Sequence, residues 1–288
     1  MYDNILFPYD GSEGAAEVLH HASEIAHWAD ATLNVVYVAD TTRDSVTVVE
    51  GHTVDALEQR GEDVVEEAAQ TLDTLGVSYD TDVVQGNPAP TIVDYAQRFD
   101  QDLVVMPTHG RGGVSRYLLG SVSEKVVRLS SVPVLTVRMQ PDEQLTFPYE
   151  NVLVPTDGSA AATHAAAHLL DFAAALEATV HVLSVVEDAG LGPDVRSASS
   201  GDETERAAAE AVDAVVSEAE TRGVDTVRHV EHGSPVEQIL DSIDANDVHA
   251  VGMGTTGRRG TDRILLGSVA ENTVRSAPVP VLTVAAPE

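Results

Sequence analysis

Cysteine is absent from this chain of 288 residues, which excludes disulfides and thiolate metal sites. No apolar run approaches the roughly 18 to 20 residues that a transmembrane helix needs. The first residues, MYDNILFPYDGS, lack the basic segment and the long apolar segment of a secretion signal. The hydrophobic content of 43% is nevertheless enough for sizeable buried cores. These features predict a cytoplasmic protein without a membrane partner.

Basic residues are scarce. Lysine and arginine together number 16 against 47 aspartates and glutamates, the net charge is −31, and Lys125 is the only lysine. Binding to a nucleic acid needs a basic face that neutralises phosphates, and no long basic stretch exists here. The acidic residues are interleaved with apolar ones, which argues against a disordered acidic tail. We therefore expect no nucleic-acid partner.

The acidic excess also predicts how stability depends on salt. Like charges repel one another within the folded chain, and molar salt screens them because the Debye length falls to about 3 Å. We interpret the composition as adaptation to a high-salt cytoplasm, with an ordinary acidic protein as the alternative. Thermal melts should show weak folding in dilute buffer and a higher melting temperature in molar KCl. An unchanged melting temperature would contradict the adaptation.

The chain contains one sequence unit twice, at a constant offset of 147 residues. NILFPYDGS begins at Asn4 and NVLVPTDGS begins at Asn151. RYLLGSVSE at 116–124 matches RILLGSVAE at 263–271, and VPVLTV occurs at 132–137 and again at 279–284. Because the offset never drifts, the two halves are copies of one fold. We predict domains at 1–138 and 150–288, joined by a linker at 139–149.

Each copy alternates short apolar runs with helical patterns. In the first copy the runs that predict strands are 5–8, 33–38, 77–84, 103–106 and 134–137. Segments 12–29 and 56–76 repeat apolar residues at the three- and four-residue spacing of amphipathic helices. This alternation predicts an α/β fold in which each domain has an open parallel sheet of five strands with helices on both faces. Segment 45–53 fits either a strand or a loop.

A glycine-rich connection follows the fourth strand of each copy. In the second copy it contains Gly254, Gly257, Gly260 and Gly267, and it leads into a helix predicted to open at Ser268. Backbone N–H groups in such turns, and at helix starts, favour anions. The two connections also hold a group of arginines in a chain that has few: Arg111, Arg116, Arg258, Arg259 and Arg263. We interpret these connections as phosphate-binding loops.

Two plainer interpretations of the same residues stay open. Ser268 with Glu271, and Ser121 with Glu124, match the S-x-x-E capping box, so the serines could serve as helix caps. The glycines could serve only to make a tight turn. Two known nucleotide motifs are excluded. GMGTTG at 252–257 follows the fourth strand rather than the first, unlike a dinucleotide fingerprint, and neither loop has the G-K-[ST] of a Walker A motif.

The combined motifs resemble those of the universal stress protein family. G-x-x-G, nine residues and then G-S resembles the ATP-binding motif of that family, and it occurs as Gly254, Gly257 and Gly267-Ser268. PYDGS and PTDGS match the family's first strand end, YVAD and more loosely SVVE its second, and VPVLTV its last strand. The resemblance covers both copies, and with the acidic composition it predicts a tandem protein from a halophilic archaeon.

The resemblance implies a flavodoxin-like fold with strand order 3-2-1-4-5 and ATP, accompanied by Mg²⁺, across the ends of strands one and four. Residues near Asp157 would line the adenosine, Val185 would meet the adenine through its backbone, and Gly254 would lie under the ribose. The loop and the following helix start would hold the phosphates. The implied ligand contacts of the second copy are Pro155, Thr156, Asp157, Val185, Met253, Gly254, Thr256, Gly257, Arg258, Gly267, Ser268 and Val269.

The first copy departs from the motif at Pro107, which stands where the second copy has Gly254. Proline lacks an N–H and adds a ring where the backbone should lie close to the sugar. This copy could therefore bind ATP weakly, bind another ligand or bind nothing. Its matching contacts would be Pro8, Asp10, Val38, Met106, His109, Gly110, Arg111, Gly120, Ser121 and Val122.

No catalytic or metal-binding residue can be nominated from the sequence. His164 and His168 have the four-residue spacing of one helix face, and His20 and His21 are neighbours on the equivalent helix of the first copy. No third metal ligand is indicated for either pair. No residue is an evident base for water attack, so a regulatory ATP-binding protein is favoured over a slow ATPase or phosphotransfer enzyme. A dimerisation scaffold without a nucleotide is the third possibility.

The resemblance also implies how the copies associate. In the family the last strand pairs antiparallel with its twin, so the two VPVLTV strands would form an intrachain pseudo-dimer and cover two sheet edges. Two chains would then form a homodimer.

Overall fold

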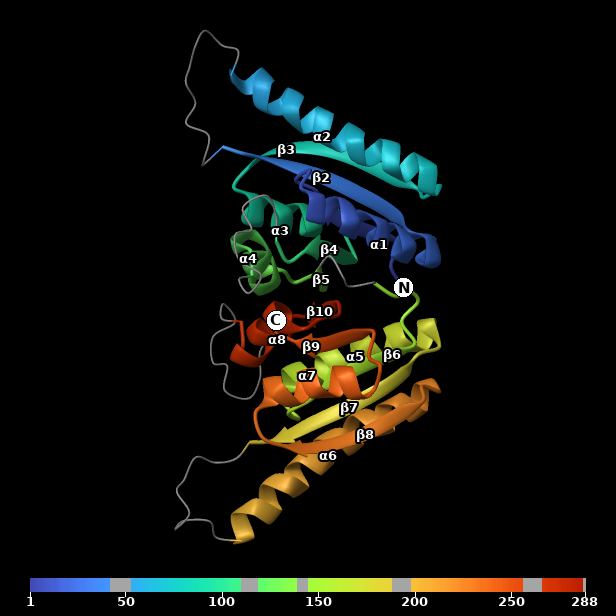
Figure 1. Ribbon diagram of the computed structural model, residues 1–288, viewed down its shortest axis with the longest axis vertical. Helices are drawn as coiled ribbons and strands as arrows, with labels where there is room; N and C mark the ends of the chain where they lie inside the picture. Colours follow the sequence, from blue (N-terminus) through green and yellow to red (C-terminus); the bar gives the residue numbers. More distant parts are fainter. Residues whose placement is uncertain (42–52, 110–118, 139–144, 188–197, 256–265, 287–288) are drawn as a thin grey trace. The chain divides into compact units, whose positions relative to one another are not determined.

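The computed structural model of the chain describes residues 1–41, 53–109, 119–138, 145–187, 198–255 and 266–286 (Figure 1). The chain divides into two compact units, Met1–Phe147 and Pro148–Glu288. Each unit alternates strands with helices along the sequence, as the hydrophobic patterns predict.

Unit 1 contains a parallel sheet in the order β3-β2-β1-β4-β5. From β1 the chain winds outward through β2 to β3, then returns to place β4 on the other side of β1. Right-handed crossovers in the two directions put helices on both faces, with α1 beside α2 and α3 beside α4. Its elements are β1 (Asn4–Pro8), α1 (Glu13–Ala29), β2 (Thr32–Asp40), α2 (Thr53–Leu75), β3 (Tyr79–Gly86), α3 (Pro88–Arg98), β4 (Leu103–Pro107), α4 (Ser121–Leu129) and β5 (Val134–Val137).

Unit 2 repeats this arrangement, with the order β10-β9-β6-β7-β8. Here β6 corresponds to β1, and β9 to β4. Its elements are β6 (Asn151–Pro155), α5 (Ala160–Leu176), β7 (Thr179–Val186), α6 (Ala198–Arg222), β8 (Thr226–His232), α7 (Pro235–Ala245), β9 (Ala250–Gly254), α8 (Ser268–Ser276) and β10 (Val281–Val284).

The predicted fold class is confirmed, and the strands predicted in the first copy agree with the observed ones to within two residues at each end. Central strands bury both faces, as parallel strands between helix layers do; Ile5, Leu6 and Phe7 of β1 are fully buried. In segment 45–53, which fits a strand or a loop, Thr53 begins α2 and the rest lies outside the described residues.

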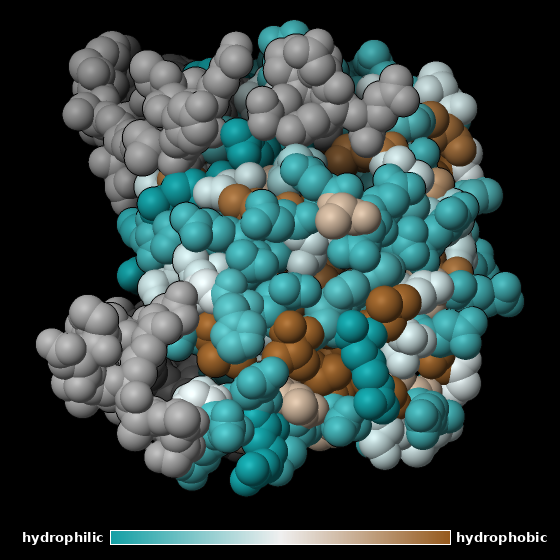
Figure 2. Space-filling model, turned by 60° about the horizontal axis from the view of Figure 1, so that its bottom comes forward, coloured by the Kyte–Doolittle hydropathy of each residue, from teal (hydrophilic) through white to brown (hydrophobic). Residues whose placement is uncertain are grey.

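Polar side chains cover much of the face that Figure 2 draws, in keeping with the acidic composition. Figure 2 shows hydrophilic residues over most of the described part of the face it draws, with smaller apolar areas between them. Among the described residues, the exposed large apolar side chains are Met1, Phe99, Leu129 and Val227.

The last residue of unit 1 packs against its first helix. The ring of Phe147 meets the rings of His21 and Trp28 edge-on, each at a centroid distance of 5.9 Å. His21 is 1% exposed, and its Nδ1 lies 3.3 Å from Glu24 Oε2. Burial, followed by the neighbouring His20, lowers the pKa of His21 from 6.5 to about 4. This histidine is therefore a neutral residue of the core at neutral pH.

The buried His21 predicts an acid-sensitive contribution to stability. Because the unfolded chain takes up a proton near pH 6.5 and the folded chain only near pH 4, the stabilisation is complete above pH 6.5 and is lost as the pH falls. The free energy of unfolding should drop by up to about 3 kcal/mol across this window. Urea unfolding in molar KCl should show that His21→Leu lacks this drop and that His27→Leu, on the exposed side of α1, retains it. An identical pH profile for His21→Leu and the wild type would contradict the assignment.

Candidate functional site

The ends of β1 and β4 lie at the switch point of the unit 1 sheet, because β2 lies on one side of β1 and β4 on the other. Ligands of open parallel sheets bind beyond the carboxyl ends of strands at this point. The first residue after β1 and the first residue after β4 each continue the hydrogen bonding to the neighbouring strand, β2 and β5 respectively. The N–H of Tyr9 donates to the Val36 carbonyl at 2.9 Å, and that of Thr108 to the Val137 carbonyl at 2.9 Å.

Unit 2 has the same construction at the ends of β6 and β9. The Thr156 N–H donates to the Leu183 carbonyl at 2.8 Å, and the Thr255 N–H to the Val284 carbonyl at 3.1 Å. The two sets of residues predicted to contact a ligand, after the first strand and after the fourth, therefore start from adjacent strands at one sheet edge. Val185 is half-buried and lies two residues beyond Leu183, toward the same edge. Val38 occupies the matching place two residues beyond Val36.

The D-G-S sequence after the first strand forms the turn into the following helix. Asp157 Oδ1 accepts the Ser159 N–H at 2.9 Å, and the Ser159 hydroxyl accepts the Ala162 N–H at 3.2 Å. Asp10 and Ser12 do the same in unit 1, at 3.0 Å and 3.3 Å. The serines are thus the N-caps of α5 and α1. The aspartates have a structural role at this turn, and a role toward a ligand stays a prediction.

The capping-box interpretation of the serines after the glycine loops is wrong. The N-cap of α8 is Gly267, in an extended conformation, so Ser268 is the first helical residue and its hydroxyl caps nothing. Glu271 does not complete the box either, because the Gly267 N–H that it would accept donates to the Thr255 carbonyl at 2.8 Å. The Glu271 carboxylate pairs instead with Arg275 at 2.6 Å. In unit 1 the N-cap of α4 is Gly120, and Ser121 is again the first helical residue.

Both helices consequently start without a side-chain cap. The first N–H groups of a helix have no partner within the helix, and in α1 and α5 a serine satisfies one of them. In α4 and α8 the N-cap is a glycine, which has no side chain to make such a bond. Ser121 and Ser268 are exposed, and Val122 and Val269, which follow them, are half-buried. These starts combine N–H groups that have no partner within the helix with the positive end of a helix dipole, which suits an anion.

The glycine before each of these serines closes the base of the loop. The Gly267 N–H donates to the Thr255 carbonyl at 2.8 Å, and the Gly120 N–H to the Thr108 carbonyl at 2.8 Å. A Cβ at position 120 would lie 2.8 Å from that carbonyl oxygen and 3.6 Å from the Cα of His109. The tight-turn interpretation therefore holds for this glycine, whatever the loop also binds.

The fourth strand of unit 1 ends in residues that differ from those of unit 2. The Ser123 hydroxyl donates to the Pro107 carbonyl at 2.9 Å, whereas unit 2 has Ala270 at the matching position. His109 Nδ1 lies 3.0 Å from the Thr108 hydroxyl, and its buried Nε2 has no hydrogen-bond partner in the described part of the chain. Burial, with a contribution from Arg138, lowers the pKa of His109. His109 is thus a neutral polar group at the predicted loop.

Some of the remaining predicted ligand contacts lie among the described residues, and the others do not. Pro8 and Pro155 end β1 and β6, and Gly254 ends β9. The side chains of Met106 and Met253 are buried, at 4% and 6% exposure, within β4 and β9. The residues predicted to hold phosphates within the loops, Gly110, Arg111, Thr256, Gly257 and Arg258, and the further arginines Arg116, Arg259 and Arg263, lie outside the described residues.

Two further findings concern metals and membranes. Across the described ranges, no group of three or more histidine, aspartate or glutamate side chains is placed to hold a metal ion. His168 is half-buried, and burial is the main cause that lowers its pKa. None of the helices in the described segments has both the length and the apolar character for crossing a bilayer.

Comparison with known proteins agrees with this architecture. The model of the universal stress protein family matches residues 1–138 and 148–285. A universal stress protein of Methanocaldococcus jannaschii is 34% identical over 141 residues, which cover 48% of this chain and 83% of the relative. One of Mycolicibacterium smegmatis is 28% identical over 79% of this chain and 77% of its own length.

A solved structure extends the likeness to the whole chain. The crystal structure of a universal stress protein from Archaeoglobus fulgidus matches with a TM-score of 0.75 at 23% identity, covering 99% of this chain and 97% of that one. At 23% identity this match shows a shared fold. Common descent rests on the two matches of the family model along the sequence. Tandem matches over nearly the whole length, on two units of the same topology, leave one conclusion: this chain belongs to the universal stress protein family.

Proposed function

We propose that this family member binds ATP with Mg²⁺ at the glycine loop of unit 2 and acts as a regulatory protein. The observation that carries the proposal is the start of α8. The N-cap of this helix, Gly267, has no side chain to cap it, and the helix opens at the G-S end of the G-x-x-G-(9)-G-S motif, beside the switch point of the sheet. A polyphosphate would supply the acceptors that the N–H groups of this helix start lack.

Charge supports the same placement. In a chain of net charge −31, an anionic ligand needs a local reversal of sign. Residues 255–268 contain Arg258, Arg259 and Arg263 against a single acid, Asp262. Glu271, the acid in the first turn of α8, is paired with Arg275 and is thereby partly neutralised. Mg²⁺ would accompany the phosphates as their counter-ion, and the chemistry it would supply is charge neutralisation.

Unit 1 is proposed as the weaker or silent site. It keeps the uncapped helix start at α4 and the loop closure by Gly120. It differs at Pro107, which supports a loss of affinity where the backbone should approach the sugar. His109, with a buried nitrogen that lacks a partner among the described residues, supports a ligand preference that differs from that of unit 2.

A regulatory role is favoured over catalysis because the described site presents no general base. Asp157 is exposed and accepts a backbone N–H of its own turn. The test is ATP binding in molar KCl together with ADP release. We expect saturable binding, and ADP release no faster than in Gly267→Val. Release well above that variant would favour the slow ATPase, and absence of binding would favour the scaffold.

The proposed association of the copies has a narrower basis. β5 and β10 each lie at the end of the strand order of their own unit. Pairing of these strands as an intrachain pseudo-dimer, the homodimer, the cytoplasmic location and the halophilic source stay predictions.

A further inference from the structure

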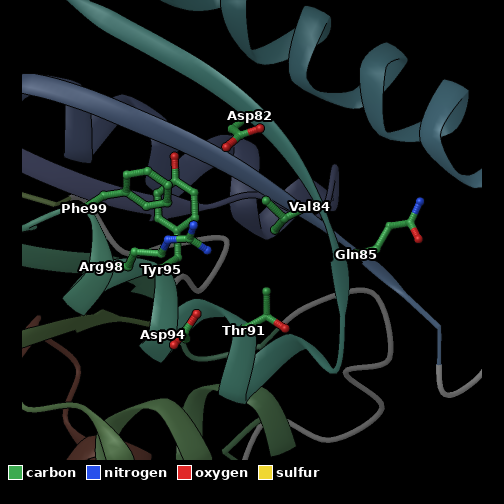
Figure 3. Close-up of a pocket in the computed structure, with 8 residues that line it drawn as sticks. All are labelled: Asp82, Val84, Gln85, Thr91, Asp94, Tyr95, Arg98 and Phe99. Carbon is green, nitrogen blue, oxygen red and sulfur yellow. The ribbon is translucent and has the colours of Figure 1, made fainter.

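Unit 1 has a pocket of about 270 Å³ between β3 and α3, and none of the predicted nucleotide contacts is among its lining residues (Figure 3). Its volume lies just below the range of about 300–1,000 Å³ for sites of drug-sized ligands, which suits a smaller molecule of amino-acid size. The pocket is lined by Asp82, Val84, Gln85, Thr91, Asp94, Tyr95, Arg98 and Phe99.

The spacing of these residues explains why they share one pocket. Residues 91, 94, 95 and 98 follow the three- and four-residue spacing of one helix face, and residues 82 and 84 alternate onto one face of β3. Figure 3 shows Tyr95 rising from α3 with its hydroxyl toward Asp82, and Val84 facing the helix from the strand. Gln85 points away from the centre.

One wall of the pocket is aromatic. The rings of Tyr95 and Phe99 lie 4.3 Å apart between centroids, and the Arg98 guanidinium carbon is 5.7 Å from the centre of the Phe99 ring. Burial, then the charge of Asp82 and a hydrogen bond to it, raises the pKa of Tyr95 to about 12. The phenol therefore stays protonated and donates to Asp82. Phe99 is 50% exposed, which is unusual for a large apolar side chain in this chain.

Two opposite charges at the rim are not paired with each other. Asp94 and Arg98 are one helical turn apart, a spacing at which such side chains usually form an ion pair. In the described part of the chain neither makes an ion pair, and Arg98 instead lies over the Phe99 ring. An arginine without an acidic partner is notable where 47 acids surround 16 bases. The pocket thus offers one cationic side chain, Arg98, and two anionic ones, Asp94 and Asp82, beside an apolar wall. Asp82 already accepts the Tyr95 hydroxyl, which leaves Asp94 as the anionic contact for a ligand.

Unit 2 lacks this chemistry at the matching positions. The offset of 147 puts Ser242 in place of Tyr95, Ala245 in place of Arg98 and Asn246 in place of Phe99. Only the acid is retained, as Asp241 in place of Asp94. The pocket is therefore a property of the first copy, and the second copy provides natural control residues for it.

We propose that this pocket binds a small zwitterion, a free α-amino acid with an apolar side chain being the chemical class that fits. The carboxylate would pair with Arg98, whose planar fork suits it, and the ammonium group would pair with Asp94. The apolar side chain would lie against Val84, Tyr95 and Phe99. Side chains four residues apart on a helix, as Asp94 and Arg98 are, have Cβ atoms about 6 Å apart. One small molecule can therefore contact both.

The test compares three probes that differ only in charge. L-leucine carries both charges, leucinamide only the positive one and N-acetyl-leucine only the negative one. In calorimetric titrations of the full chain, at the lowest salt that keeps it folded, we expect leucine to bind at least about tenfold more tightly than either analogue. Equal binding of leucinamide would identify a site for cations instead, and equal binding of N-acetyl-leucine a site for anions. Either result, or no saturable binding of any probe, would overturn the proposal.

Variants locate the binding. Arg98→Ala introduces the unit 2 residue and should weaken leucine binding about tenfold, the effect of about 1.4 kcal/mol. Asp94→Asn should do the same, whereas Asp241→Asn, the matched change in unit 2, should have no effect. Each variant should keep the thermal melt of the wild type, because both pocket side chains are exposed. Unchanged leucine affinity in Arg98→Ala and Asp94→Asn would show that the zwitterion binds elsewhere.

Discussion

Calorimetric titration of the chain with ATP and Mg²⁺ in molar KCl is expected to give a single site, and Gly254→Pro is expected to remove it. This substitution writes the residue of unit 1 into unit 2 at the end of β9. A proline ring there would occupy the space where the backbone should approach the sugar. The expected loss is at least about a hundredfold in affinity, about 2.7 kcal/mol.

The fold should tolerate this proline because unit 1 already carries it. In β4 the N–H groups that donate to β5 and its flank come from Val104 and Thr108, at 2.9 Å to the carbonyls of Pro133 and Val137. Pro107 lies between them, still in register with Val137, and its carbonyl accepts the Ser123 hydroxyl. The missing N–H therefore costs the sheet no bond in this ladder, and its effect should fall on the ligand.

The reciprocal substitution, Pro107→Gly, tests the same idea in the opposite direction. If proline alone silences unit 1, this variant should bind two ATP molecules per chain. A single site in this variant would mean that other residues of unit 1, His109 among them, also prevent binding. Two sites in the wild-type chain would show that Pro107 is tolerated, and would contradict the proposed difference between the units. Thermal melts in molar KCl separate these outcomes from loss of folding.

The sequence predicted the fold better than it predicted the local chemistry of the site. Strands and helices followed from hydrophobic period, and the switch point followed from the order of elements, because both depend on patterns that extend over many residues. The capping box failed because S-x-x-E has the same spacing whether the serine is the N-cap or the first helical residue. Only the backbone at Gly267 and Gly120, each in an extended conformation, distinguishes the two.

The unit 1 pocket shows a second limit of prediction from sequence. Asp82 on β3 and Tyr95 on α3 are separated by a turn, and neither belongs to a recognised motif. Their meeting depends on how closely α3 packs on β3, and the aromatic wall depends on the rotation of Phe99 toward Tyr95. What the sequence does contain is the asymmetry between copies, since an offset of 147 pairs Tyr95, Arg98 and Phe99 with small or polar residues.

The same asymmetry explains how the two cores solve one packing problem differently. In unit 2, Gly252 of β9 faces Leu169 of α5, and a Cβ at position 252 would lie 2.7 Å from the Leu169 Cγ and closer still to its methyl carbons. In unit 1 the matching residues are Val105 and Ala22, both fully buried. The larger side chain is on the strand in unit 1 (Val105) and on the helix in unit 2 (Leu169). Each pair therefore has one large and one small residue to fill the space between helix and strand.

Replacing both residues of the unit 2 pair by those of unit 1 should therefore lower the free energy of unfolding far less than the two single substitutions predict together. Gly252→Val alone forces a branched side chain into the space of Leu169, and overpacking of this kind should cost about 3 kcal/mol or more of unfolding free energy. Leu169→Ala alone leaves a cavity and should cost about 3 kcal/mol. The double variant recreates the pair of unit 1, and we expect it to recover at least about 2 kcal/mol relative to the sum of the single changes.

Urea unfolding in molar KCl measures all three variants, with Val105→Ala in unit 1 as the reference for a simple loss of volume. Non-additivity is the decisive quantity, because a glycine chosen only for its backbone would give additive effects. Gly252 precedes Met253 and Gly254, so the pair also sets how closely α5 approaches the strand that carries the proposed ATP site. If the double variant folds well but loses ATP binding while Gly254 is intact, the close approach of α5 to β9 is a requirement of the site. If binding survives, complementary volume is the whole reason for the glycine.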